Sequence, residues 1–154
     1  MNELELLKEI ENLDKDITTK ELFTRILRES DWDTLVAWWD WWPGWTAPPK
    51  SFLSENGTGG LMVEKNGIPI VAGFIYETNS DVALFEWVVS NPKYKEKDRQ
   101  DAIEKLIIDA EDTIKAMGYK RIFSIGKSKS LMNTHKKLGW FVDDKPSHEI
   151  LKNL

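Results

Sequence analysis

The chain has 154 residues, a formal net charge of −5, and 41% hydrophobic and 31% charged side chains, which is the size and composition of one globular domain. It has no cysteine, and this excludes disulfide bonds, thiolate metal sites and a cysteine nucleophile. No apolar run reaches membrane-spanning length, and the acidic N-terminus is unlike a signal peptide. We therefore expect a cytoplasmic protein without a membrane partner.

Charge is distributed unevenly along the chain. Residues 1–112 carry 12 basic and 23 acidic side chains, whereas residues 113–142 carry seven basic side chains and no acidic one. The acidic majority argues against nucleic acid as a partner. The basic segment suits a small polyanion, and it is equally compatible with a solvated helix face and loop.

The first elements are a helix and a short strand. Residues 3–17 have apolar side chains at helical spacing, which predicts an amphipathic helix. This stripe consists of Leu6, Ile10, Leu13 and Ile17. We predict an N-terminal helical extension over 1–20, ahead of a main domain over 21–154. Residues 22–28 are expected to form an edge strand.

A tryptophan-rich helix and a loop come next. Asp31 is a suitable N-cap for a helix over 32–42, and Pro43-Gly44 would end that helix. A loop rich in proline and glycine follows over 44–60, with a helical turn expected near 51–53.

The middle of the chain predicts three antiparallel strands. Residues 60–65 and 68–77 flank Asn66-Gly67, whose residues tolerate the positive φ angles of a tight hairpin turn. Residues 82–90 are almost continuously apolar. Such a strand is typically central in a sheet and covered on both faces.

The last third of the chain alternates helices and short apolar segments. A helix is predicted over 98–117, with Asp98 as its N-cap and Gly118 as its C-cap. A short buried strand over 121–125 and a short helix over 130–138 follow.

Two final strands are expected, over 140–142 and 149–151. The whole order of elements predicts an α/β (α+β) protein with a mixed, mostly antiparallel sheet and helices on both faces.

Several stretches resemble the GNAT (GCN5-related N-acyltransferase) superfamily. Residues 26–32 resemble its first strand and first helix, residues 86–95 its fourth strand and cofactor loop, and residues 136–141 the end of its last helix. The resemblance covers about residues 22–152. The tryptophan-rich segment and residues 56–60 resemble phage-type and environmental members of the family.

The resemblance implies acetyl-CoA as the cofactor, bound where the fourth and fifth strands separate. It places the pantetheine beside Val88, Val89 and Ser90, with Ser128 as a further contact. It places the phosphate loop on Lys95, Glu96, Lys97, Asp98, Arg99 and Gln100. A helix N-terminus of this kind favours an anion because its backbone N–H groups are unpaired.

The phosphate loop departs from the family pattern. Glu96, Asp98 and Gln100 stand where the family has glycines, which permit close backbone approach to phosphate. A carboxylate capping the helix would occupy the N–H groups that a phosphate needs. Either the basic side chains between these positions bind the phosphates instead, or the loop is a solvated charged turn before a capped helix.

Two residues are candidates for acid–base chemistry. Glu86 is a charged residue in an apolar strand, where burial would raise its pKa towards that of a useful base. A structural hydrogen bond is the alternative role. By the resemblance, His135 occupies the position of the family's acid, although a lone histidine on a short helix is commonly surface or core. Two histidines without cysteine predict no metal site.

The tryptophans in and after the predicted helix 32–42 are the most unusual feature of the sequence. Trp38, Trp42 and Trp45 share one helical face if the helix continues that far, and Trp87 lies in the strand that carries Glu86. They are candidates for the wall of an acceptor pocket, which suits a cationic or amine-bearing small molecule. The alternative is that these tryptophans pack in the core.

Two functions follow as hypotheses. The first is an acyl-CoA-dependent N-acetyltransferase that moves an acetyl (acyl) group directly to the amine of an unidentified acceptor. The second is a catalytically silent GNAT-like binding or regulatory module. Residues 3–17 would then dock a partner or form a homodimer.

Overall fold

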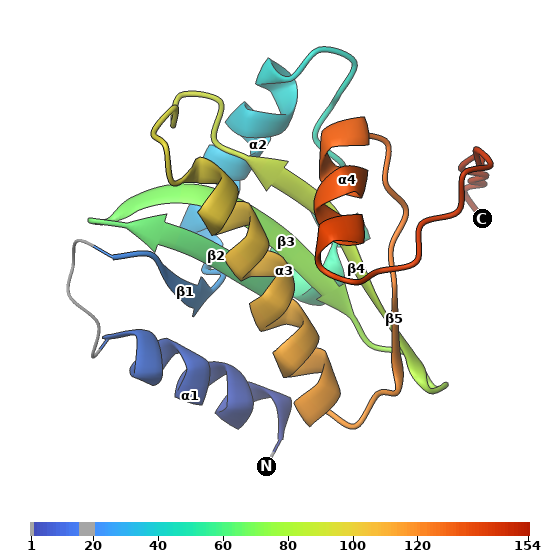
Figure 1. Ribbon diagram of the computed structural model, residues 1–154. Coiled ribbons are helices and arrows are strands. Elements are labelled where there is room, and N and C mark those ends of the chain that lie inside the picture. The colour runs from blue at the N-terminus through green and yellow to red at the C-terminus, as the bar shows by residue number, and fades with distance from the viewer. Residues whose placement is uncertain (1, 16–20) are drawn as a thin grey trace.

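A mixed β-sheet forms the centre of the protein (Figure 1). The structure is a computed structural model that describes the backbone of residues 2–15 and 21–154 and the side chains of 2–10 and 21–154. Within these residues the sheet has five strands in the order β1-β2-β3-β4-β5. They are β1 (Phe23–Ile26), β2 (Gly60–Lys65), β3 (Ile68–Tyr76), β4 (Val82–Ser90) and β5 (Arg121–Phe123). Neighbouring strands are antiparallel except β4 and β5, which are parallel, so the predicted mixed sheet is confirmed.

The predicted helices are present with small shifts of their ends. They are α1 (Glu3–Lys15), α2 (Trp32–Trp41), α3 (Arg99–Ala116) and α4 (Lys129–Lys137). Three 3-10 turns, η1 (Glu29–Asp31), η2 (Lys50–Phe52) and η3 (Ser54–Gly57), complete the order, and η2 confirms the helical turn expected in the loop. Residues 16–17 of the predicted first helix lie outside the described residues.

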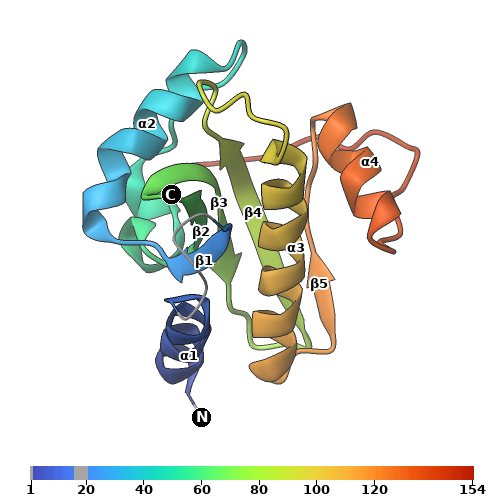
Figure 2. The same ribbon diagram turned by 60° about the vertical axis from the view of Figure 1, so that its left-hand side comes forward.

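Helices cover both faces of the sheet, with α2 on one side and α3 on the other (Figure 2). Successive strand residues point to opposite faces, so β2 and β3 contribute to two cores. The core on the α3 side includes Leu61, Val63, Phe85, Leu106 and Ile107. The core on the α2 side includes Leu35, Trp39, Met62 and Phe74. Strand β4 also contributes to both cores, through Ala83 and Phe85 on one face and Val89 on the other, so the expectation that 82–90 is covered on both faces is confirmed. Its edge beyond Leu84 has no paired strand on the β5 side among the described residues.

The N-terminal helix joins the larger core. Leu7 of α1 is buried in the same cluster as the apolar face of α3. From the predicted stripe, Leu6 and Ile10 are half-buried, and Leu13 and Ile17 lie outside the described side chains. In the part of the chain that the structure describes, no helix is long and apolar enough to cross a membrane.

The hairpin between β2 and β3 has the predicted turn. Asn66 and Gly67 have φ angles of 53° and 74°, which are the left-handed conformations of a two-residue hairpin loop. The turn fixes the register of the two central strands and so confirms the hairpin.

A β-bulge interrupts β4. Ala72 pairs with Val89 and Phe74 pairs with Glu86, so two residues of β4 lie opposite Gly73. One of them, Trp87, has a φ of 58°, which is strained for a residue with a side chain. A Cβ atom at Gly73 would lie 2.4 Å from the Phe85 ring, so only glycine fits there. The bulge re-aims the side chains that follow it on β4.

A buried group of three charges ties the start of α2 to the sheet. Arg25 Nη1 donates to Asp31 Oδ2 and Arg25 Nε donates to Glu64 Oε2, both at 2.8 Å. Burial alone would raise the pKa of Asp31, but hydrogen bonds from Arg25 and from the Arg28 backbone N–H hold it below its usual value. Asp31 therefore stands at the predicted N-cap position of α2, but its side chain makes no cap hydrogen bond to that helix because it binds Arg25 instead.

The C-terminal strand predictions are also wrong. Residues 140–154 contain no strand, and Phe141 and Ile150 are 91% and 95% exposed. The predicted buried strand 121–125 is a three-residue edge strand, β5, with Phe123 exposed. An apolar segment becomes a strand only where a partner edge is available, and the chain after α4 does not pair with β5.

Candidate active site

Strands β4 and β5 separate after Leu84, the third residue of β4. Their pairing is limited to Val82–Leu84 against Arg121–Phe123, and the rest of β4 has no strand on that side among the described residues. Glu86 lies where they part. Its two carboxylate oxygens accept the backbone N–H of Ile125 at 3.0 and 3.2 Å. The carboxylate therefore bridges the gap that opens between the strands.

The environment of Glu86 suits a general base. Burial raises its pKa to about 7, the hydrogen bond from Ile125 opposes this, and the nearby charge of Glu149 adds to the rise. A carboxyl group that titrates near neutral pH can accept a proton from an ammonium and release it again. Glu86 also makes the structural hydrogen bond that was its alternative role, and the two roles are compatible.

A groove of about 550 Å³ opens beside the unpaired part of β4. The ends of α2 and β4, the first turn of α3 and the start of α4 converge on it. It is lined by eight of the predicted cofactor residues, Val88, Val89, Ser90, Glu96, Lys97, Arg99, Gln100 and Ser128. The volume is in the range of small-molecule sites.

Other residues line the groove without having been predicted. They are Trp39, Val71, Ile103, Ser130, Leu131 and Thr134. Trp39 belonged to the tryptophan-rich helix but not to its predicted face. The remaining five reach the groove through tertiary packing, for which the sequence contains no local signal.

The first turn of α3 is available to an anion. Asp98 precedes the helix, but its carboxylate makes no cap hydrogen bond. It binds Lys65 Nζ at 2.7 Å and the Tyr94 hydroxyl at 2.6 Å, and these partners lower its pKa. The backbone N–H groups of Gln100 and Asp101 have no acceptor within the described part of the chain. Asp98 therefore stands at the predicted N-cap position, but its side chain does not cap the helix, because it binds Lys65 and Tyr94 instead. Its contact with the cofactor stays a prediction, and Asp98 does not line the groove.

Arg99 and Trp42 meet at the end of β4. Arg99 Nη2 donates to Ser90 Oγ at 2.7 Å, and its guanidinium lies 5.4 Å from the centre of the Trp42 ring. The Trp42 indole N–H donates to the Ser90 carbonyl at 2.9 Å. A cation is therefore held in the groove by an aromatic face and a hydroxyl. Lys95, the remaining predicted phosphate contact, is exposed and does not line the groove.

His135 lies in the core and does not line the groove. Its Nδ1 bonds the Leu131 carbonyl at 2.8 Å, its ring packs against Trp140 with centres 4.6 Å apart, and its Nε2 is buried without a partner in the described structure. Burial lowers its pKa. These contacts favour packing over the acid role that the resemblance implied.

The tryptophans divide between core and groove. Trp38 is buried in the α2-side core, whereas Trp42 and Trp45 line the groove. They do not share a helical face as predicted, because α2 ends at Trp41 and the chain turns there. Trp87 is half-buried on the bulge and packs edge-on against Trp39, with ring centres 6.1 Å apart.

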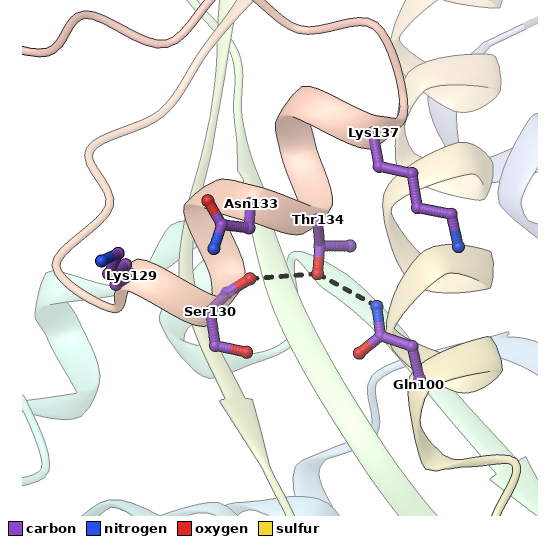
Figure 3. A pocket seen from close by; sticks show the side chains of 6 residues that line it. All are labelled: Gln100, Lys129, Ser130, Asn133, Thr134 and Lys137. Carbon is purple, nitrogen blue, oxygen red and sulfur yellow. Dashed lines mark hydrogen bonds between the residues drawn. The ribbon is translucent and has the colours of Figure 1, made fainter.

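A second hollow of about 490 Å³ adjoins the groove between α3 and α4 (Figure 3). It shares Gln100, Ser130 and Thr134 with the groove, and Gln100 Nε2 donates to Thr134 Oγ1 at 3.0 Å. Lys129 and Lys137 line it as well. The predicted basic segment therefore brings two lysines to this hollow, and the Lys137 ammonium is paired with the Glu104 carboxylate at 2.7 Å.

Comparison with known proteins gives a match at the level of structure. No protein-family model matches the chain, and a search of curated proteins found no match. An acetyltransferase from Trypanosoma brucei has 17% identity and a TM-score of 0.56 over 85% of this chain and 100% of its own. A ribosomal-protein alanine N-acetyltransferase from Escherichia coli has 13% identity and a TM-score of 0.61 over 77% of each chain. AAC(6')-Iy, solved with the bisubstrate analogue CoA-S-monomethyl-acetylneamine, has 14% identity and a TM-score of 0.58 over 87% of this chain and 99% of its own.

These similarities define the class of architecture. The chain has the GNAT acyltransferase fold, a mixed sheet whose fourth and fifth strands part over a groove. At identities of 17% and below they establish the fold, and what the site does must be argued from its residues.

Proposed function

We propose that this protein is an acyl-CoA-dependent N-acyltransferase that acetylates the amine of a small molecule by direct transfer. One observation carries the proposal. The groove joins a helix N-terminus with unpaired N–H groups to the strand that holds Glu86, whose pKa is about 7. The anion site lies in the groove, and the candidate base lies on the same strand as Val88, Val89 and Ser90 of its lining, although Glu86 itself does not line the groove.

The groove fits the phosphates of acyl-CoA. The N–H groups of Gln100 and Asp101 would donate hydrogen bonds to an oxyanion at the positive end of the α3 dipole. Arg99 adds a charge at the groove, and its guanidinium is suited to phosphate. Of the two carboxylates in the glycine-free loop, Asp98 is paired with Lys65. Glu96 lines the groove together with Lys97 and Arg99, whose positive charges offset its own.

The chemistry requires a base for the acceptor ammonium. Acetyl-CoA supplies a thioester, in which the C–S bond breaks as the amine nitrogen forms the new C–N bond. Glu86 takes one proton of the ammonium so that the free amine can attack. The nitrogen gives up a second proton to solvent as the amide forms, and the departing thiolate is protonated from solvent. Because Ile125 holds the carboxylate at the opening of the sheet, Glu86 is oriented before the acceptor arrives.

The acceptor side is aromatic and acidic. Trp42 and Trp45 line it, and Glu86 and Glu149 are close enough for their charges to interact. Aromatic faces and carboxylates attract ammonium groups. These features support an amine as the acceptor.

Turnover tests the proposal. Purified protein is incubated with acetyl-CoA and a panel of small amines, and the released CoA thiol is measured with a thiol reagent. We expect amine-dependent release that Glu86→Gln abolishes while acetyl-CoA affinity is retained. Release that is equal in Glu86→Gln and in the wild type would remove Glu86 as the base.

The contacts of Trp42 and Arg99 with Ser90 favour the binding-module alternative. Trp42 and Arg99 occupy the carbonyl and hydroxyl of Ser90, so the end of β4 is closed in this structure. Acetyl-CoA binding without acetylation of any amine would support that alternative.

A further inference from the structure

One ammonium group of the chain already lies on the acceptor side. Lys127 Nζ is 5.2 Å from the centre of the Trp45 ring and 3.2 Å from Glu149 Oε2. An aromatic face and a carboxylate are the two groups with which proteins recognise alkylammonium ions. Trp45 and Glu149 therefore form a pair that is complementary to a cation, and Lys127 is its occupant.

This pair adjoins the proposed reaction centre. Trp45 lines the groove. Lys127 follows Ile125, the residue whose N–H holds Glu86, by two positions. Glu149 lies near enough for its charge to act on Glu86. A cation bound at Trp45 and Glu149 would thus be a near neighbour of an amine at Glu86.

The internal cation is easily displaced. The Lys127 and Glu149 side chains are 53% and 56% exposed, and exposed ion pairs contribute little to stability. Glu149 belongs to the C-terminal segment without helix or strand, so no regular hydrogen bonding fixes it against Lys127. Trp45 itself is 37% exposed. A ligand cation can therefore replace Lys127 without disturbing the fold.

We propose that the acceptor carries two ammonium groups, as in a small diamine or polyamine. One loses its proton to Glu86 and is acylated, and the other binds Trp45 and Glu149 in the place of Lys127. The inference rests on the proposed function and adds the substrate class to it. Without ligand, the Lys127 ammonium occupies the cation site. A monoamine has only the amine that reacts at Glu86, so it has no second ammonium group to bind in the place of Lys127.

The test compares 1,4-diaminobutane with n-butylamine, which has the same carbon chain and one amine. The quantity measured is the ratio of their kcat/KM values with acetyl-CoA, because any effect on Glu86 itself cancels in the ratio. We expect the wild type to favour the diamine by about tenfold, the value of a modest cation site. Lys127→Ala should raise the ratio and Glu149→Gln should bring it close to one.

Lys152→Ala is the matched control, since it removes an exposed lysine of the same C-terminal segment and should leave the ratio unchanged. A ratio near one in the wild type, or a ratio that Glu149→Gln leaves unchanged, overturns the inference.

A second measurement separates this inference from the proposed function. Calorimetric titration with 1,4-diaminobutane, without acetyl-CoA, should give about tenfold tighter binding to Lys127→Ala than to Glu149→Gln. Equal affinities in the two variants overturn the diamine site even if butylamine is acetylated. If the wild type does not bind acetyl-CoA but the two variants still differ in their affinity for the diamine, only the proposed function is overturned.

Discussion

Replacing Glu86 by glutamine removes the one titrating group that the proposed reaction needs. In the protein, burial first and the charge of Glu149 second raise the pKa of Glu86 to about 7, against the hydrogen bond from Ile125. The carboxylate is the active form of a base, so the rate must rise with pH through that value. Glutamine has the same shape and cannot accept the proton.

The size of the pH effect follows from the pKa. A group with a pKa of about 7 is about one-tenth ionised at pH 6 and about nine-tenths ionised at pH 8. With both substrates saturating, kcat should therefore increase about tenfold between these two pH values if Glu86 is the base. A glutamate with its ordinary pKa would be ionised throughout this range and would give no such step.

The assay is the pH profile of kcat for thiol release, measured on the wild type and on two variants. Glu86→Gln should lose the step together with most of the rate. His148→Ala, which removes an exposed imidazole of the C-terminal segment, should keep the step. A flat wild-type profile, or a step that persists in Glu86→Gln, would refute the reasoning.

Two predictions concern the scaffold. Gly73→Ala should destabilise the protein by about 2 kcal/mol and lower Tm by about 5 °C, because the new Cβ would meet the Phe85 ring at 2.4 Å; an unchanged Tm in a thermal melt would contradict the bulge. Arg25→Met should cost about 3–5 kcal/mol in urea unfolding, since it leaves the buried carboxylates of Asp31 and Glu64 without their partner. Because Arg25 lowers the pKa of Asp31, the stability from this ion group is present above the ordinary pKa of an aspartate and is lost as pH falls. The unfolding free energies of the variant and the wild type should therefore converge in acid. A difference between them that is independent of pH would contradict the ion group.

Much of the fold could be predicted because it follows from local patterns. The Asn66-Gly67 turn and the strands beside it were readable from residue type, and so was the long helix from its apolar spacing. The C-terminal strands failed for the opposite reason. Segments such as 140–142 have strand composition, but pairing depends on a partner edge that the sequence does not specify.

The candidate site was predictable in position more than in detail. The order of elements brought the end of β4 and the start of α3 together, as expected. The partner of Asp98 is Lys65, which lies 33 positions away, so the sequence favoured the local cap instead. The positive φ of Trp87 has no local signal either, because its bulge belongs to the register between β3 and β4.

Acetyl-CoA binding tests the central claim most directly. Calorimetric titration of the wild type should give saturable binding, because the groove offers the free N–H groups of α3 and the charge of Arg99. Arg99→Ala should weaken the affinity about tenfold, the loss of one charge-assisted contact, and Asp98→Asn should leave it within about twofold, since that carboxylate faces Lys65. No binding of acetyl-CoA at millimolar concentration, or a larger loss in Asp98→Asn than in Arg99→Ala, would contradict the assignment of this groove.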